Sequence, residues 1–249
     1  MSEQSLAFGV DPRRSEKFSL RQSRYHALSL DVSRLAGEAK KRGERLRLLD
    51  IGVSVGVSMR YIEVQPHADN IDYYGADLVA HDLYKNEKWK KIYVGDFMEG
   101  YPEIEDEAFD VVICEQVLEH LPVIETAIKT LERLLKPGGT LIVGVPIFVD
   151  GLDMARKYIV PVIDKVTKNP KVRGHVQAFS LRTFKKHLRR NTALDLQESR
   201  GFRIISGGIL KPLENKEWWW RFNRSLGAKV PALCIEVQVR AKKPERRPS

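Results

Sequence analysis

Short apolar runs alternate with helix-compatible segments through the middle of the chain. Each run has the length of a buried strand, and each is followed by a turn or a helical segment; the runs are residues 46–51, 71–77, 91–94, 109–114 and 140–146. Apolar residues recur at helical spacing between them, as in 121–135. Strands that alternate with helices at such intervals form a parallel sheet with helices on both faces. We therefore expect an α/β fold with a doubly wound sheet.

The flanking regions follow other patterns. Residues 15–41 have helical periodicity, and Gly43 ends that helix. After Pro146 the alternation breaks, with a helix expected at 153–167 and a second one after Ser180 as N-cap. Two further strands are expected, at 202–209 and 232–240. In the second, Ile235, Val237 and Val239 are predicted to point inward, and Glu236, Gln238 and Arg240 outward.

These patterns divide the chain into parts. We expect an N-terminal helical extension (1–45), one domain (46–240) with insertions at 147–200 and 211–230, and a disordered basic tail (241–249). The second insertion is polar and rich in tryptophan. At 249 residues the chain is long enough for one large core.

The composition indicates the cellular compartment of the protein. No apolar run approaches the roughly 18 residues needed to cross a bilayer, no secretory signal is visible, and Cys114 and Cys234 are the only cysteines. These features favour a cytoplasmic protein without a disulfide framework. No His/Cys/Asp cluster has metal-ligand spacing, so no metal is expected.

Charge is distributed unevenly. The net charge is +9, but residues 46–150 contain 9 basic and 19 acidic residues, whereas residues 151–249 contain 23 basic and 8 acidic ones. Such asymmetry suggests that the C-terminal part meets an anionic partner; a solvated basic surface is the alternative.

The first strand leads into a glycine turn, in the sequence Leu48-Leu49-Asp50-Ile51-Gly52 and onward to Gly56. Glycines allow positive φ and a close approach of backbone to ligand, and the following helix N-terminus has unpaired N–H groups. Asp77 ends the second strand 21 residues after Gly56. That spacing is typical of a carboxylate that binds a ribose diol.

These segments resemble the class I S-adenosylmethionine-dependent methyltransferases, in particular those that act on small molecules, lipids and sugars. The resemblance rests on LLDIGVSVG at 48–56, GADL at 75–78, GDF at 95–97, FDVVICEQVLEHL at 109–121 and LLKPGGTLIVGVP at 134–146, with GHVQAFSLRTFKKHL and RGFRI further on. It covers about 46–240. It implies a mostly parallel, seven-stranded Rossmann-like sheet with an antiparallel last strand, S-adenosyl-L-methionine as cofactor, and methyl transfer as the activity.

The resemblance also implies roles for individual residues. Gly52, Ser54 and Gly56 would approach the methionine part of the cofactor, and Asp50 would hold that turn. Ser54 replaces the family's middle glycine and fits if its φ is negative. The remaining cofactor contacts would be Asp77 to the ribose, Leu78, Asp96 and Phe97 at the adenine, and Glu115 and Gln116 along the cofactor's open side.

Methyl transfer needs a base only where the acceptor must lose a proton. His120, after the fourth strand, and His175, before the Phe179-Ser180 helix start, are the candidates. For His120 the alternative is packing at a helix start. We expect His175, Phe179 and part of 148–160 to line the acceptor pocket as a lid, with an anionic acceptor or carrier.

Other interpretations stay open. The cluster Trp218-Trp219-Trp220 with Arg221 and Phe222 is either an anchor at a lipid surface, a lid over a lipid-linked or aromatic substrate, or an element packed on the sheet edge. The net charge is compatible with a nucleic-acid (RNA) methyltransferase, although no motif for base amines and no RNA-binding module is visible. A catalytically silent cofactor-binding protein is the third class. The sequence does not specify the acceptor atom or the oligomeric state.

Overall fold

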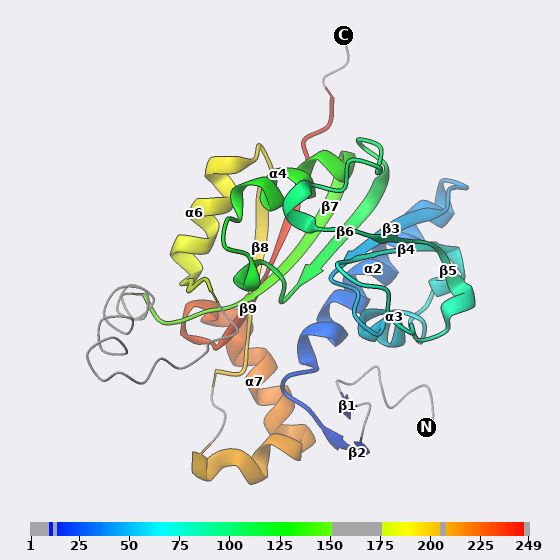
Figure 1. Cartoon of the computed structure of the whole chain (residues 1–249). Coiled ribbons are helices and arrows are strands. Elements are labelled where there is room, and N and C mark those ends of the chain that lie inside the picture. The colour runs from blue at the N-terminus through cyan, green and yellow to red at the C-terminus, as the bar shows by residue number, and fades with distance from the viewer. Residues whose placement is uncertain (1–9, 12–13, 151–175, 205–207, 247–249) are drawn as a thin grey trace.

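The computed structural model describes residues 10–11, 14–150, 176–204 and 208–246. Within them, one seven-stranded sheet has the order β5-β4-β3-β6-β7-β9-β8 (Figure 1). Its strands are β3 (Leu46–Ile51), β4 (Ile71–Asp77), β5 (Trp89–Val94), β6 (Phe109–Glu115), β7 (Leu135–Pro146), β8 (Asp195–Phe202) and β9 (Glu236–Lys242). Strand β9 is antiparallel to both β7 and β8, and the pairs among β3 to β7 are parallel. The predicted doubly wound sheet with an antiparallel last strand is confirmed.

Helices cover both faces of the sheet (Figure 1). They are α2 (Ser23–Lys41), α3 (Val57–Ile62), α4 (Glu125–Leu134), α6 (Leu181–Asn191) and α7 (Glu217–Lys229). Successive strand residues point to opposite faces. Leu48 therefore packs in the cluster with α2 and α3, and Leu49 in the cluster with α4 and α6. Burial on both faces explains why these strands are continuously apolar.

The strand order places a topological switch point at the carboxyl ends of the central strands. Strand β3 pairs with β4 on one side and with β6 on the other, so the connections from β3 and β4 lead away from those from β6 and β7. Open α/β sheets bind their ligands at such a switch point.

The N-terminal region differs from the prediction at its start. The helix begins at Ser23 rather than Ser15, and Arg14–Phe18 form β2, which pairs with β1 (Val10–Asp11). The predicted end of the helix is confirmed, since Gly43 has φ +75° and donates its N–H to the carbonyl of Lys40.

Two strands of the C-terminal half differ from their predictions, and the strand expected at 232–240 lies at Glu236–Lys242. The strand predicted at 202–209 lies at Asp195–Phe202, and together with α6 it belongs to the main sheet and core, although it falls inside the predicted insertion 147–200. In β9, Glu236 and Gln238 are buried rather than outward, because α2 covers that face: Arg24 Nη1 lies 3.0 Å from Glu236 Oε2.

The remaining segments give mixed outcomes. Ser180 is the N-cap of α6 as predicted, and the Trp-rich segment forms α7. The predicted helix at 153–167 lies outside the described residues. The expectation of a disordered tail from residue 241 is wrong for its first residues, since β9 reaches Lys242 and Lys243 exchanges two backbone hydrogen bonds with the 138–139 turn. No helix in the described part of the chain is both long and apolar enough to cross a membrane.

Candidate active site

The turn between β3 and α3 is built from left-handed residues. Gly52 and Gly56 have φ +75°, and a Cβ at Gly52 would lie 2.3 Å from Val117 Cγ2. Ser54 has φ +49°, so the condition of a negative φ for a serine at this position is not met. The left-handed conformation of a serine costs on the order of 1–3 kcal/mol. Its N–H compensates by donating to Asp77 Oδ2 over 2.8 Å.

That hydrogen bond joins two of the predicted site elements. The other oxygen of Asp77 accepts from Leu78 N, also at 2.8 Å, and its side chain stays 16% exposed. A carboxylate has about four acceptor positions, so about two remain for donors of a ligand. His81 Nε2 lies 3.5 Å from Asp77 Oδ1.

An apolar ledge follows Asp77. Leu78 and Val79 are 65% and 50% exposed, which is unusual for large apolar side chains placed next to each other. Asp96 is exposed on the next strand connection, where its Oδ1 accepts from Met98 N at 2.8 Å. Asp77, Asp96 and the ledge thus follow adjacent strands β4 and β5 at their carboxyl ends.

The Phe97 side chain does not lie on the exposed surface beside Asp96. It is buried and stacks on Tyr101, with ring centroids 5.8 Å apart. Burial raises the pKa of the Tyr101 hydroxyl, and the charges of Asp77 and Asp96 raise it further, so this phenol lies near both acids. Tyr101 was not predicted, and no pattern in the sequence distinguishes it from a core aromatic.

Asp50 is completely buried beside the turn. Its carboxylate accepts from the Ser58 hydroxyl on α3, so it holds the first turn of the helix rather than the loop amides. Burial raises the pKa of Asp50 to about 7, against the Ser58 hydrogen bond, and the charge of Asp77 adds to the rise.

The two predicted residues at the end of β6, Glu115 and Gln116, lie in different surroundings. Glu115 points beneath α2, where it accepts from Gln238 Nε2 at 2.7 Å and lies 3.4 Å from Arg24 Nε. Burial raises the pKa of Glu115 to about 8 despite Arg24. Gln116, with φ +59°, precedes Val117 over the glycine turn, and its buried Nε2 has no hydrogen-bond partner among the described residues.

Glu119 was missed by the sequence reasoning. Its side chain is buried, and within the described part of the chain neither carboxylate oxygen accepts a hydrogen bond. Burial raises its pKa to about 7. It lies on the 3₁₀ helix Leu118–His120, and its position next to His120 was the available signal. The His120 side chain is 48% exposed, with Nε2 3.9 Å from Glu119 Oε1.

The predicted lid is described only in part. His175 and residues 151–160 lie outside the described residues. The chain resumes at Val176, which donates its N–H to the Glu119 carbonyl over 2.9 Å. Phe179 does not line an acceptor pocket: it is buried in the α4 and α6 core, 5.4 Å from the Phe184 ring, so that prediction is wrong.

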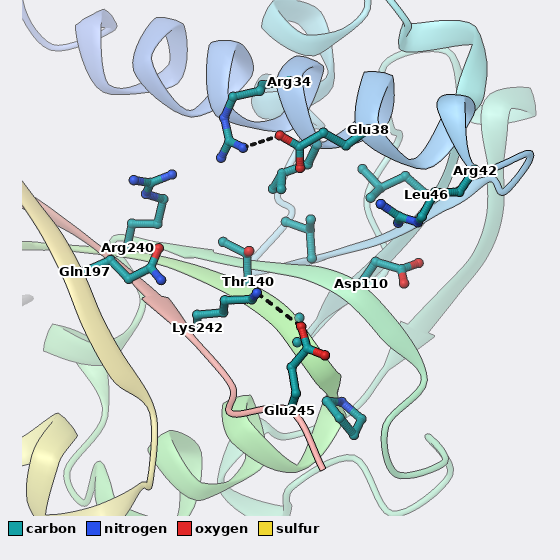
Figure 2. Close-up of a pocket in the computed structure, with 15 residues that line it drawn as sticks. Arg34, Glu38, Arg42, Leu46, Asp110, Thr140, Gln197, Arg240, Lys242 and Glu245 are labelled. Atoms are coloured by element: carbon teal, nitrogen blue, oxygen red, sulfur yellow. Dashed lines mark hydrogen bonds and ion pairs between the residues drawn. The ribbon is translucent and has the colours of Figure 1, made fainter. Parts of the chain in front are cut away.

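A separate cavity of about 770 Å³ lies elsewhere on the sheet (Figure 2). Its walls include Leu46, Asp110 and Thr140 near the beginnings of parallel strand segments, with charged side chains from α2 and β9 around them. Ligands of open α/β sheets bind at the opposite, carboxyl ends. The cavity is therefore not the candidate site.

Comparisons with known proteins agree with this geometry. Residues 20–193 match a family described as "Methyltransferase domain". The ubiquinone biosynthesis O-methyltransferase of Vibrio atlanticus is 30% identical over 95 residues, which are 37% of this chain and 40% of that protein. The chain thus matches well under half the length of this curated relative.

Solved structures share the fold. The N-methyltransferase NodS from Bradyrhizobium japonicum has a TM-score of 0.53 at 16% identity, over 91% of this chain and 97% of that one. The CurJ carbon methyltransferase has a TM-score of 0.52 at 15% identity, over 89% of this chain and 55% of that one. At such identities the likeness shows the fold alone.

Proposed function

The chain belongs to the methyltransferase-domain family as a class I S-adenosylmethionine-dependent methyltransferase, and we propose that it methylates an oxygen or nitrogen of a small-molecule, sugar or lipid-linked acceptor. Bound S-adenosylmethionine supplies a methyl group already activated on a sulfonium. The protein then has to bind the cofactor and the acceptor, align the methyl group with the acceptor atom, and exclude water.

The residues present fit this cofactor. The hydrogen bond from Ser54 N to Asp77 Oδ2 carries the assignment, because it fixes the glycine turn against the acid that would receive the ribose hydroxyls. In this proposal Leu78 packs on the adenine and Asp96 accepts from its amino group. Gly52 has no side chain, so Val117 can pack directly against the turn, where a Cβ would lie 2.3 Å from Val117 Cγ2.

The acceptor side is proposed around Glu119, His120 and His175. A hydroxyl acceptor must lose its proton, and a base works best with a pKa near the working pH. The Glu119 carboxylate, with its pKa raised to about 7, suits that task. Support for His175 is its position next to Val176, whose N–H bonds to the Glu119 carbonyl. A neutral amine acceptor would need no such base.

An anionic acceptor is favoured by charge. Residues 151–249 contain 23 basic and 8 acidic residues, and this half of the chain follows the carboxyl end of β7, at the edge of the sheet where the candidate site lies. The fold leaves the acceptor atom open, because the similar proteins above are named for transfer to oxygen, nitrogen and carbon.

The proposal is tested with methyl-labelled S-adenosylmethionine and three acceptor panels: hydroxylated aromatics with a carboxylate, phosphorylated sugars, and amines. We expect label on one of these panels. If a hydroxyl acceptor is found, Glu119→Gln should lower the rate at saturating substrate while the affinity for the cofactor stays unchanged. Label recovered only on RNA, or none on any panel or cell extract while the cofactor binds, would contradict the proposal.

A further inference from the structure

The outward face of α7 exposes two large aromatic side chains. Trp218 is 58% exposed and Phe222 is 44% exposed, and they lie one helical turn apart. Scattered exposed apolar residues need no explanation, but a pair of aromatics on one helix face forms a patch.

The rest of the helix holds this pair rigidly. The opposite face of α7 is buried: Trp219 and Trp220 pack with Leu20, and Gly227 lies so close to β8 that an added Cβ would be 2.1 Å from the Gly201 carbonyl oxygen. Trp219 also contacts both exposed rings, at 5.4 Å from Trp218 and 5.5 Å from Phe222. Burial of the exposed pair therefore needs no rearrangement of the helix.

Exposed basic residues are frequent in the segment that contains the aromatic pair. The segment 208–229 contains five basic and two acidic residues, and its exposed positions include Lys211, Lys216, Arg221 and Lys229. Arg221 is paired with Glu217 at 2.7 Å, which leaves a lysine excess around the patch. Aromatic side chains with lysines on a helix surface are typical of helices that lie in the headgroup region of a membrane.

The position of α7 in the molecule is compatible with contact to a membrane surface. Helix α7 lies at the periphery of the molecule, beside β2 and the beginning of α2 (Figure 1). The beginning of α2 is also where Arg24 meets Glu115, at the carboxyl end of β6. The α7 face and the candidate active site are therefore at the same edge of the sheet.

We propose that the surface formed by Trp218, Phe222 and Lys229 of α7, together with Lys211 and Lys216 of the segment before it, docks on an anionic lipid surface. The two aromatics enter the headgroup region, and the lysines are attracted to the anionic lipid. A second copy of the chain is disfavoured, because it would bring the same lysines into contact with themselves. Single-stranded nucleic acid is disfavoured because it is bound in basic grooves with open stacking platforms, whereas this face is the outer side of a helix at the periphery of the molecule (Figure 1). The proposal does not depend on the identity of the methyl acceptor.

The test is flotation of the full chain, without cofactor, with phosphatidylcholine vesicles and with vesicles that also contain phosphatidylglycerol. We expect binding to the anionic vesicles only, weakened by salt. The double variant Trp218→Ser with Phe222→Ser should bind about tenfold or more weakly, and Lys216→Glu should lower binding further. Leu30→Ser, an equally exposed apolar position on α2, and Lys41→Glu at the other end of α2 are the matched controls and should bind as the unmodified chain does.

A second measurement does not rely on variants. Tryptophan emission should shift to shorter wavelength on anionic vesicles, and brominated lipid should quench it. Absence of vesicle binding, or equal binding by the double variant, would overturn the proposal. So would a loss of self-association in light scattering, or of oligonucleotide binding, caused by the double variant while vesicle binding stays unchanged.

Discussion

At the scale of single residues, the candidate site contains two kinds of carboxylate, one partly exposed and the others buried. Asp77 remains partly open and engaged by two backbone N–H groups, which suits an acceptor of ligand hydroxyls. Asp50, Glu115 and Glu119 are buried, and burial raises the pKa of each. A buried carboxylate with a raised pKa costs stability when it ionises, and groups of this kind cluster at functional sites; all three lie at or just after the carboxyl ends of β3 and β6.

Asp77→Ala should weaken binding of S-adenosylmethionine and of S-adenosylhomocysteine alike. The loss should be about 1.5–3 kcal/mol, the worth of hydrogen bonds to a charged acceptor. Isothermal calorimetry measures both affinities. Asp72→Ala provides the control, because Asp72 lies on the same strand β4 but at its other end, where it pairs with Arg45. Unchanged affinity in the Asp77 variant would refute its assignment.

Asp50→Asn should change how stability depends on pH. The pKa of Asp50 rises from 3.8 to about 7 on folding, so the folded protein binds the extra proton between these values. The stability from this group is complete below the unfolded value and is lost as pH rises through the folded one. Urea unfolding from about pH 5 to about pH 8 should therefore show a smaller loss of stability for Asp50→Asn than for the unmodified chain. Parallel curves for the two proteins would contradict the raised pKa; Asp72→Asn is the control.

At the scale of elements, α6 and β8 show two ways in which a segment joins the sheet. Helix α6 has a local signal: Phe184 and Leu188 form its buried stripe, and Ser180 forms a capping box with Thr183. Strand β8 is polar, with Asp195, Gln197 and Glu198 in its sequence, and it is placed by its pairing with β9. An edge strand needs little apolar character, because its place is fixed by backbone hydrogen bonds.

Ser180→Ala should destabilise the protein by about 1 kcal/mol, the usual cost of losing an N-cap side chain. The Ser180 hydroxyl accepts from Thr183 N, and Thr183 Oγ1 accepts from Ser180 N in return. Denaturant unfolding measures the change. Ser225→Ala, at an exposed position inside α7, should leave the free energy of unfolding within a few tenths of a kcal/mol of the unmodified chain. An equal loss of stability in both variants would contradict the capping role.

At the scale of the whole molecule, the C-terminal segment closes the amino-terminal end of the sheet. Lys243 Nζ donates to the carbonyls of Glu132 and Leu135, and Arg246 pairs with Glu107. The basic end of the chain is thus attached to the acidic central region, which explains part of the charge asymmetry along the sequence.

Truncation before Lys243 should lower the thermal midpoint by about 4–12 °C. Among the removed residues, Lys243 makes two backbone hydrogen bonds and the side-chain contacts above, worth on the order of 2–3 kcal/mol, and 1 kcal/mol shifts the midpoint of a chain of this size by about 2–4 °C. Truncation after Arg246 leaves these contacts in place and is the matched control. Equal thermal midpoints for both truncated chains would show that the contacts of Lys243 do not contribute to thermal stability.

The sequence by itself determined the central strands and the order of the cofactor motifs. Strand β4 was predicted at its observed bounds, because a buried strand is a local apolar run bounded by turn residues. The glycine turn and Asp77 were likewise readable, since conformational freedom at glycine and a carboxylate at a strand end are properties of one short segment.

Only the tertiary structure decided what depends on contacts between distant segments. The left-handed Ser54, held by Asp77, the burial of Glu236 under Arg24, and the core position of Phe179 each arise from partners far along the chain. The same holds for Glu119, because the burial of its carboxylate, which accepts no hydrogen bond within the described part of the chain, is set by the elements packed around it. Local patterns carry no information on such surroundings, because burial and charge pairing are set by the packing of elements against one another.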